Sequence, residues 1–173
     1  MSFNAALAFT LDQEGGWYDG SKPSDPNPTY KGVRQDTYNR YRAEHGLAPQ
    51  SVQLIGPTEL NDLYFGYWTD ARCAALGMLS GLVVFDHAVN RGPANGIRIV
   101  QVAAGTTPDG QWGALTAAAV AAVSDTALAS RLLWARLADY YQVAEANPSE
   151  RPDLPAWLGR VLACRKAVLA AGG

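Results

Sequence analysis

Apolar residues recur at helical spacing along most of this chain. Near the N-terminus, Phe3, Leu7 and Leu11 follow one another at four-residue steps until Gly15-Gly16 ends the run, which predicts a helix over residues 3–14. A further helix is expected to begin after Pro57, with Thr58 as its N-cap. The same periodicity predicts helices over residues 35–45, 79–90, 95–104, 115–123, 125–146 and 154–170.

Between residues 17 and 33 the helical pattern stops. This stretch is rich in Gly, Pro, Asp, Asn and Ser and carries three aromatic residues, which is typical of a turn-heavy loop or a small irregular hairpin. The predicted fold class is therefore mainly α, with one short irregular β element after the first helix.

The stretch 79–89 is apolar on nearly all sides, and such a helix must be buried all round. It ends at Asn90-Arg91-Gly92-Pro93, which looks like a tight turn between two apolar helices. We therefore expect two regions, residues 1–90 and 91–173, packed together as one globular and cooperative unit.

The charge pattern narrows the choice of partners. The 173 residues carry 14 basic and 16 acidic side chains, a net charge of −2, and no run of Lys or Arg stands out. This pattern does not favour nucleic acid or a membrane surface as a partner. The longest apolar runs fall short of the roughly 20 residues of a spanning helix, so no membrane insertion is expected. We expect a monomer.

The N-terminal residues Met1-Ser2-Phe3-Asn4 show no basic region followed by a long apolar core, so no ordinary signal peptide is predicted. We expect synthesis in the cytoplasm, with action elsewhere only after release or dedicated export. The two cysteines, Cys73 and Cys164, lie far apart in sequence and outside any metal-like spacing, and we expect them to be unpaired.

Glu14 is the most informative single position. On a helix, Glu14 lies about 20° from Leu7 and on the same face as Leu11. A carboxylate at the end of an apolar stripe is partly desolvated, which favours the protonated form that a general acid needs. A solvated glutamate in the last turn beside a glycine cap is the alternative, and helix geometry alone does not choose between the two.

Sequence motifs favour the interpretation of Glu14 as a general acid. The stretch Glu14-Gly15-Gly16-Trp17-Tyr18, followed by Asp25-Pro26, Thr29 and Gly32-Val33, resembles the signature of glycoside hydrolase family 108. Three later blocks are similar to the family in the expected order: Tyr64 to Trp68 before Arg72, Phe85-Asp86-His87-Ala88-Val89-Asn90-Arg91-Gly92-Pro93, and Asp109-Gly110-Gln111-Trp112-Gly113-Ala114-Leu115-Thr116. These lysozyme-like N-acetylmuramidases include many phage endolysins, and the last block resembles their helical peptidoglycan-binding region.

The resemblance implies a lysozyme-like fold and cleavage of the β-1,4 bond between N-acetylmuramic acid and N-acetylglucosamine in bacterial peptidoglycan. It implies that Glu14 is the acid. Glycosidases usually use a second carboxylate, for which Asp25 is the first candidate and Asp19 a rival. Thr29 is a candidate for orienting water. The family's Asp-Pro-Gly-Gly is here Asp25-Pro26-Asn27-Pro28, apparently one residue shorter, so the placement of Asp25 relative to Glu14 stays open.

Candidate substrate-binding residues lie near both the first helix and the central one. Trp17, Tyr18 and Tyr30 are close to Glu14 in sequence and offer aromatic faces to sugar rings, although core packing is the commoner fate of an aromatic residue. Asp86 and Asn90, four residues apart on the predicted central helix, are further candidates. A structural hydrogen-bonding role fits those two polar residues equally well.

Metal and cofactor chemistry find no support in the sequence. His45 and His87 are 42 residues apart without a matched third ligand or a His-Glu-x-x-His motif, so we expect no metal and no cofactor. Two other functions remain open beside the muramidase. One is a lytic transglycosylase acting on the same substrate, and the other is a non-catalytic glycan-binding or secretion-accessory protein.

Overall fold

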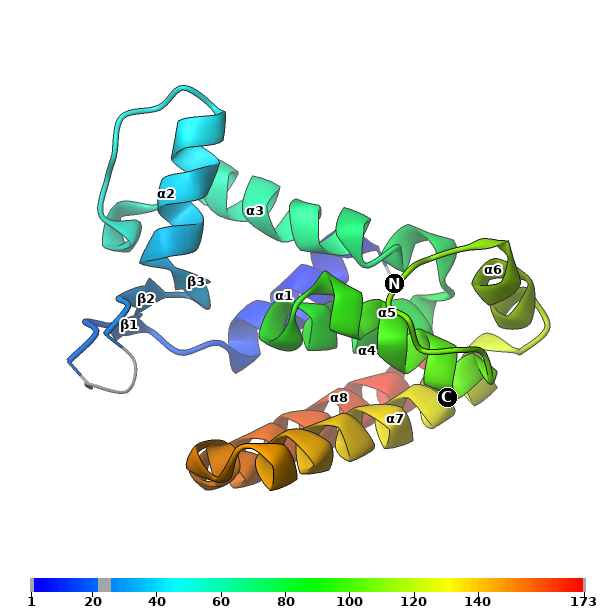
Figure 1. Cartoon of the computed structure of the whole chain (residues 1–173). Helices are drawn as coiled ribbons and strands as arrows, with labels where there is room; N and C mark the ends of the chain where they lie inside the picture. Colours follow the sequence, from blue (N-terminus) through cyan, green and yellow to red (C-terminus); the bar gives the residue numbers. More distant parts are fainter. Residues whose placement is uncertain (1, 22–25, 173) are drawn as a thin grey trace. The chain divides into compact units, whose positions relative to one another are not determined.

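The structure is a computed structural model that describes residues 2–21 and 26–172. Helices dominate these residues, and the three strands are short (Figure 1). The elements follow the order α1 (Phe3–Gln13), β1 (Trp17–Tyr18), β2 (Thr29–Tyr30), β3 (Val33–Arg34), α2 (Gln35–Glu44), α3 (Pro57–Asp70), α4 (Met78–Arg91), α5 (Pro93–Ala104), α6 (Ala114–Ala121), α7 (Asp125–Ala146) and α8 (Leu154–Gly172). Short 3₁₀ turns occupy Val52–Leu54, Cys73–Ala75 and Pro148–Asp153. The predicted fold class, mainly α with a small β element, is confirmed.

One predicted helix start is wrong by two residues. Helix α3 begins at Pro57 rather than after Thr58, and the amide of Leu60 donates to the carbonyl of Gly56 at 3.0 Å. Gly56 is therefore the N-cap and Pro57 the first helical residue, where a missing amide proton costs nothing. Thr58 lies inside the first turn.

The described chain forms two compact units. The first contains the N-terminal residues up to Ala6 and everything from Tyr67 onward, and the second contains Leu7–Gly66. This division differs from the expected border between residues 90 and 91, which lies inside the first unit because α4 packs against both α5 and α7. Cooperative unfolding of the whole chain stays a prediction.

The first unit is built around α4, whose residues 79–88 are all buried. Helix α7 packs against α4, α5 and α8, and α7 and α8 run side by side in Figure 1. The start of α1 joins this unit through Phe3, whose ring packs edge-to-face at 5.8 Å from both Trp68 and Phe85. The all-round burial predicted for this apolar stretch is confirmed.

Buried charges also hold the helices of this unit together. Asp86 on α4 is fully buried and pairs with Arg136 of α7 at 2.6 Å and with Arg160 of α8 at 2.8 Å. Burial alone would raise the pKa of the Asp86 carboxyl, but the two guanidinium groups outweigh it and hold the pKa below its ordinary value. Removing one partner of such a buried pair is far more costly than breaking a surface pair.

The N-terminus of α4 is capped by a residue distant in sequence. The carboxylate of Asp125, the first residue of α7, accepts from the amides of Leu79 at 2.8 Å and Ser80 at 2.9 Å. Gly77, just before α4, leaves the space that this carboxylate occupies, because a Cβ there would collide with it. The cap therefore ties the beginnings of two helices together.

The second unit contains the small sheet, α2 and most of α3. Its three strands are antiparallel in the order β1-β2-β3, with Trp17 opposite Tyr30 and Tyr30 opposite Val33. The segment from Leu47 to Gly56 connects α2 to α3 and includes the turn at Val52. Among the described residues, no helix is long and apolar enough to cross a membrane.

His87 makes the first unit sensitive to acid. The ring is fully buried, and burial lowers its pKa from an ordinary 6.5 to about 4, although Asp139 opposes the shift. Between these pH values the unfolded chain binds more protons than the folded one, so stability falls as pH falls from 6.5 to 4, by at most about 3 kcal/mol. Urea unfolding at pH 7 and pH 4.5 measures this loss.

The variant His87→Gln should weaken this pH dependence, since a neutral amide has no proton to gain. His45→Gln serves as the matched control, because His45 is exposed at the end of α2. An unchanged dependence in His87→Gln would place the acid sensitivity elsewhere.

Candidate active site

Glu14 lies directly after helix α1, in the second unit. Its amide donates to the carbonyl of Thr10 at 3.1 Å, so the helical hydrogen bonding extends one residue past Gln13. The Glu14 side chain is half-buried. Gly15 and Gly16 follow, and neither contributes a side chain that would cover the carboxyl group. The predicted position, a carboxylate at the end of an apolar helix face, is what the structure shows.

Opposite Glu14 lies the tip of the hairpin formed by β2 and β3. Tyr30 and Val33 pair across it, and the two residues between them, Lys31 and Gly32, have positive φ values of 49° and 76°. Positive φ at both central residues is characteristic of the type I′ turn, whose twist matches that of the flanking strands. The sequence predicted an irregular hairpin here, and the structure defines its register.

The hairpin tip packs directly against the catalytic candidate. A Cβ added at Gly32 would lie 2.7 Å from Oε2 of Glu14 and 2.6 Å from the hydroxyl of Tyr64. That hydroxyl donates to the carbonyl of Lys31 at 2.6 Å, and the Tyr64 side chain is buried. The backbone of Gly32 therefore fills the place where any other residue would push the carboxyl group away.

An open groove gives the Glu14 carboxyl access to solvent. It has a volume of about 480 Å³, which lies within the range of small-molecule sites. Its walls come from α1, the two glycines and the hairpin: Ala8, Leu11, Asp12, Glu14, Gly15, Gly16, Tyr30 and Lys31. A carboxyl group on the wall of a groove this size is accessible to a bound ligand.

The strand register separates the aromatic candidates. Trp17 lies opposite Tyr30, and opposite residues share one face of a sheet. Tyr30 lines the groove and Trp17 is 41% exposed, so both offer aromatic surface on that face. Tyr18 pairs with Thr29, and the alternation of side chains along a strand directs these two to the opposite face.

The structure describes two of the three candidates for a catalytic partner of Glu14. Thr29 donates its hydroxyl to the carbonyl of Asn27 at 3.2 Å, so it braces the loop. Asp19 is exposed, and hydrogen bonds from the hydroxyl and amide of Ser21 lower its pKa, which favours a charged carboxylate. Asp25 lies outside the described residues.

The two candidates on α4 belong to the first unit and are not equivalent. Asp86 is buried and its carboxylate is held by two arginines, so a substrate-binding role for it is not supported, and the structural role left open by the sequence applies. Asn90 is exposed, and its side-chain oxygen accepts from the hydroxyl of Tyr140 at 3.0 Å. Asn90 thus remains accessible to a ligand.

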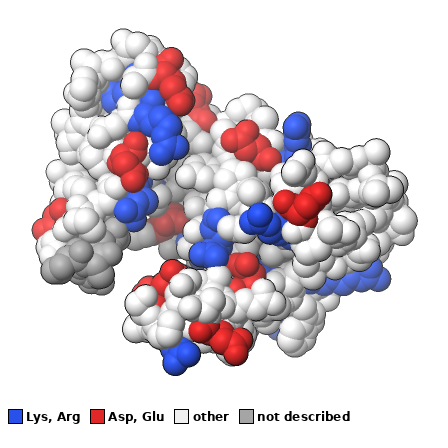
Figure 2. Space-filling model, viewed as in Figure 1, with Lys and Arg blue, Asp and Glu red and all other residues white. Residues whose placement is uncertain are grey.

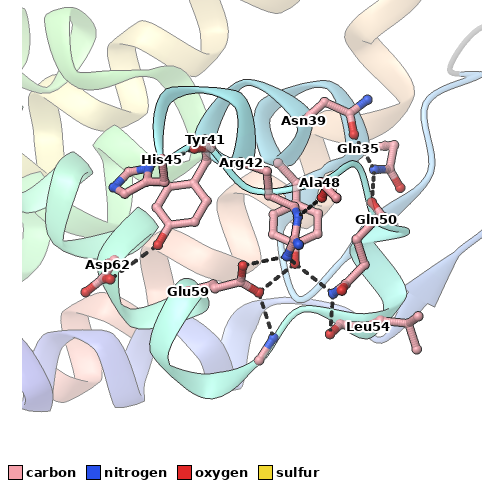
Figure 3. A network of polar contacts seen from close by, with 12 residues as sticks. Gln35, Asn39, Tyr41, Arg42, His45, Ala48, Gln50, Leu54, Glu59 and Asp62 are labelled. Atoms are coloured by element: carbon pink, nitrogen blue, oxygen red, sulfur yellow. Dashed lines mark hydrogen bonds and ion pairs between the residues drawn. The ribbon is translucent and has the colours of Figure 1, made fainter.

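A polar network supports the start of helix α3 (Figure 3). Glu59 in its first turn accepts from the Tyr38 hydroxyl at 2.6 Å and from Arg42 at 2.7 Å, both on α2. Gln50, in the connecting segment, donates to the same Tyr38 hydroxyl at 2.9 Å. These contacts join α2, the connection and α3, and so hold the helix that positions Tyr64.

The surface charges, the groups that could bind a metal and the two cysteines add three observations. Basic and acidic side chains alternate over the face shown in Figure 2, without a large area of one sign. Among residues 2–21 and 26–172, no three His, Cys, Asp or Glu side chains gather closely enough to hold a metal ion. Cys73 and Cys164 are buried free thiols, and burial raises the pKa of each to about 12.

A half-buried carboxyl in an open groove beside aromatic residues is an arrangement typical of glycosidases. Residues 7–92, about half of the chain, match the family model described as Glycosyl hydrolase 108. The chain belongs to this family and is a glycosidase, a peptidoglycan hydrolase. The predicted family and enzyme class are confirmed.

A solved structure extends the likeness beyond the matched region. SagA of Brucella abortus has 28% sequence identity with this chain, and the alignment covers 97% of this chain and 94% of that one with a TM-score of 0.79. The predicted lysozyme-like, mainly α fold is thereby confirmed over nearly the whole length. No curated protein matches the chain.

Sequence reasoning missed Tyr64 and Lys31 as parts of the site. Tyr64 was noted only as part of a block similar to the family, and its hydroxyl contact with the hairpin joins residues that are 33 positions apart in sequence. The position of Lys31 in a tight hairpin turn could have been predicted, because only two residues, one of them glycine, separate Tyr30 from Val33.

The packing at Gly32 predicts a specific loss of activity. In Gly32→Ala the new methyl group would displace the carboxyl of Glu14, so turnover on purified peptidoglycan should fall by at least about 10-fold. Stability should fall by about 1–2 kcal/mol because the alanine adopts positive φ. Initial rates and urea unfolding measure the two effects separately.

Gly46→Ala is the matched control. Gly46 also has positive φ, at 65°, but a Cβ there meets no atom within 4 Å. It should lose similar stability and keep its activity. Equal activities of the two variants would show that the contact with Glu14 does not matter for turnover.

Proposed function

We propose that this glycosidase is an N-acetylmuramidase that cleaves the β-1,4 bond between N-acetylmuramic acid and N-acetylglucosamine, with Glu14 as its general acid. One observation carries the proposal: the Glu14 carboxyl lies in the wall of an open groove and is backed by Gly32. A proton donor needs a fixed position and access to the bond that it cleaves.

In the proposed reaction, Glu14 gives its proton to the glycosidic oxygen while the bond from that oxygen to the anomeric carbon breaks. Positive charge develops on the sugar, and a second carboxylate stabilises it. Water then supplies a hydroxyl group to the anomeric carbon, and the remaining proton of that water returns to the Glu14 carboxylate. Tyr30 and Trp17, on one face of the sheet, are proposed to contact the sugar rings.

The first test is Glu14→Gln. An amide preserves the shape of the side chain but has no acidic proton, so turnover should fall by roughly 100-fold or more. Turbidity loss of purified cell walls gives the rate, and the sugar found at the new reducing end of the fragments identifies the bond that is cleaved. A muramidase product carries a new reducing end, whereas a transglycosylase product is lighter by one water.

Glu44→Gln provides the comparison, because Glu44 is an exposed carboxylate of the same unit, at the end of α2. It should lyse walls like the parent protein. Near-parental lysis by Glu14→Gln, with circular dichroism showing the same fold in both variants, would refute Glu14 as the acid.

The second catalytic group is tested by comparing three variants. We propose Asp25 as the partner, so Asp25→Asn should lose more activity than Thr29→Ala, and both less than Glu14→Gln. Thr29→Ala also removes a loop hydrogen bond, so its stability is measured in parallel. A far greater loss in Asp19→Asn than in Asp25→Asn would assign the role to Asp19 instead.

We further propose that the enzyme acts as an endolysin, reaching the wall through a membrane pore made by another protein rather than through dedicated export. The motifs shared with phage lysins support this role. Expression inside a bacterium, with and without a pore-forming protein, tests it: lysis is expected only when the pore is present. Lysis without the pore would point to another route of export.

A further inference from the structure

A second groove adjoins the Glu14 groove, and Lys31 belongs to both. It has a volume of about 280 Å³ and lies wholly within the second unit. The two grooves share Leu11 and Lys31. The second groove is lined mainly by apolar side chains from α1 and from the start of α3 and its connection: Leu7, Leu11, Ile55, Pro57 and Leu60, with Lys31 and Asn61 as its polar members.

The charge of Lys31 is directed to solvent at this junction. Its side chain is exposed, and its ammonium group lies 5.3 Å from the centre of the Tyr30 ring. Among the described residues, no carboxylate forms an ion pair with it, although Asp12 and Glu14 line one of the grooves. The ammonium is thus available to an anionic ligand, and the aromatic ring restricts where it lies.

The backbone at Lys31 indicates that its side chain serves more than the turn. With φ of 49° it occupies the first central position of a type I′ turn, where asparagine, aspartate and glycine are favoured. A lysine there costs stability compared with those residues. Such strain is common at functional sites, where the side chain is needed for something other than the local fold.

We propose that the second groove binds the stem peptide of the muramyl residue at the cleavage site, with Lys31 pairing to a carboxylate of that peptide. The inference rests on the muramidase function proposed above. A muramyl sugar in the Glu14 groove carries a short peptide of small apolar and acidic residues, and the groove next to it offers apolar walls and one cation. Its volume lies just below the usual range of small-molecule sites, so it takes only the first residues of the peptide.

The roles of the groove residues follow from their chemistry. Leu7 and Leu60 contact the methyl group of the alanine that begins the peptide, and the side-chain amide of Asn61 hydrogen-bonds its backbone. Lys31, between the grooves, pairs with the carboxylate of the acidic residue that follows. Specificity then depends on the peptide as well as on the sugar, and peptide-free glycan is the poorer substrate.

The test compares two substrates: intact glycan strands and the same strands stripped of their peptides by an amidase. Lys31→Asn removes the charge and suits the turn, so the fold should be kept. The ratio of kcat/KM on intact strands to that on stripped strands should fall about 3- to 5-fold, mainly through KM, as expected for one exposed charge contact. Lys31→Arg should restore much of the ratio.

Lys166→Asn, an exposed lysine of α8 in the other unit, is the control and should leave the ratio unchanged. As a second measurement, the free stem peptide released by the amidase should inhibit the parent enzyme competitively on intact strands, and Lys31→Asn less so. An unchanged ratio in Lys31→Asn, or no inhibition by the peptide, overturns the proposal.

Glu14→Gln is assayed on both substrates in parallel, which separates the two hypotheses. If that variant cleaves neither substrate while Lys31→Asn keeps the parental ratio, the muramidase holds and only the peptide subsite fails. If Glu14→Gln remains active on both, the proposed acid is wrong, whatever the result at Lys31.

Discussion

The contact between the Gly32 backbone and the Glu14 carboxyl determines most of the second unit's functional geometry. No side chain fits between them, so the hairpin tip must contain glycine at this point, and the tight turn with positive φ follows. The same approach brings the Tyr64 hydroxyl to the carbonyl of Lys31 and fixes the lysine between two grooves. A methyl group in place of one hydrogen of Gly32 would disturb the Glu14 carboxyl, the turn and Tyr64 together.

Periodicity predicted the helices well because burial in this chain follows regular spacing. Helix α7 spans the predicted residues 125–146, and the apolar stretch from Leu79 is buried on all sides. The start of α3 was misplaced because Thr58 is a good capping residue, while the rigid Pro57 takes the first helical position at no cost in hydrogen bonds. The capping and helix preferences of single residues do not determine which of two neighbouring residues begins a helix.

The site was predicted only as far as it lies in one continuous segment. Glu14 and the aromatic residues after it follow each other in sequence, so motif and helix geometry located them. Tyr64 reaches the site through a contact between distant segments, which no spacing along the chain reveals. Asp86 shows the same limit: its four-residue spacing to Asn90 was visible, but its arginine partners come from α7 and α8, 50 and 74 residues further on.

Two carboxylates, Glu14 and Asp86, illustrate how surroundings determine the use of one chemical group. Asp86 is enclosed, and the charges of Arg136 and Arg160 keep it ionised, so it stabilises helices and has no path to a ligand. Glu14 is half-buried in the wall of a groove, where a ligand can reach it. A carboxylate acts on a substrate only when access and position are combined.

The cap on helix α4 has a consequence for the order in which the chain folds. The amides at the start of α4 are satisfied by Asp125, which lies beyond α5 and α6 in the sequence. A ribosome therefore releases α4 well before its capping group exists, and the free amide ends have only water until α7 arrives. The most extensively buried helix of the described chain thus obtains its cap only from a late segment, and a chain that ends before α7 leaves that helix uncovered and prone to aggregate.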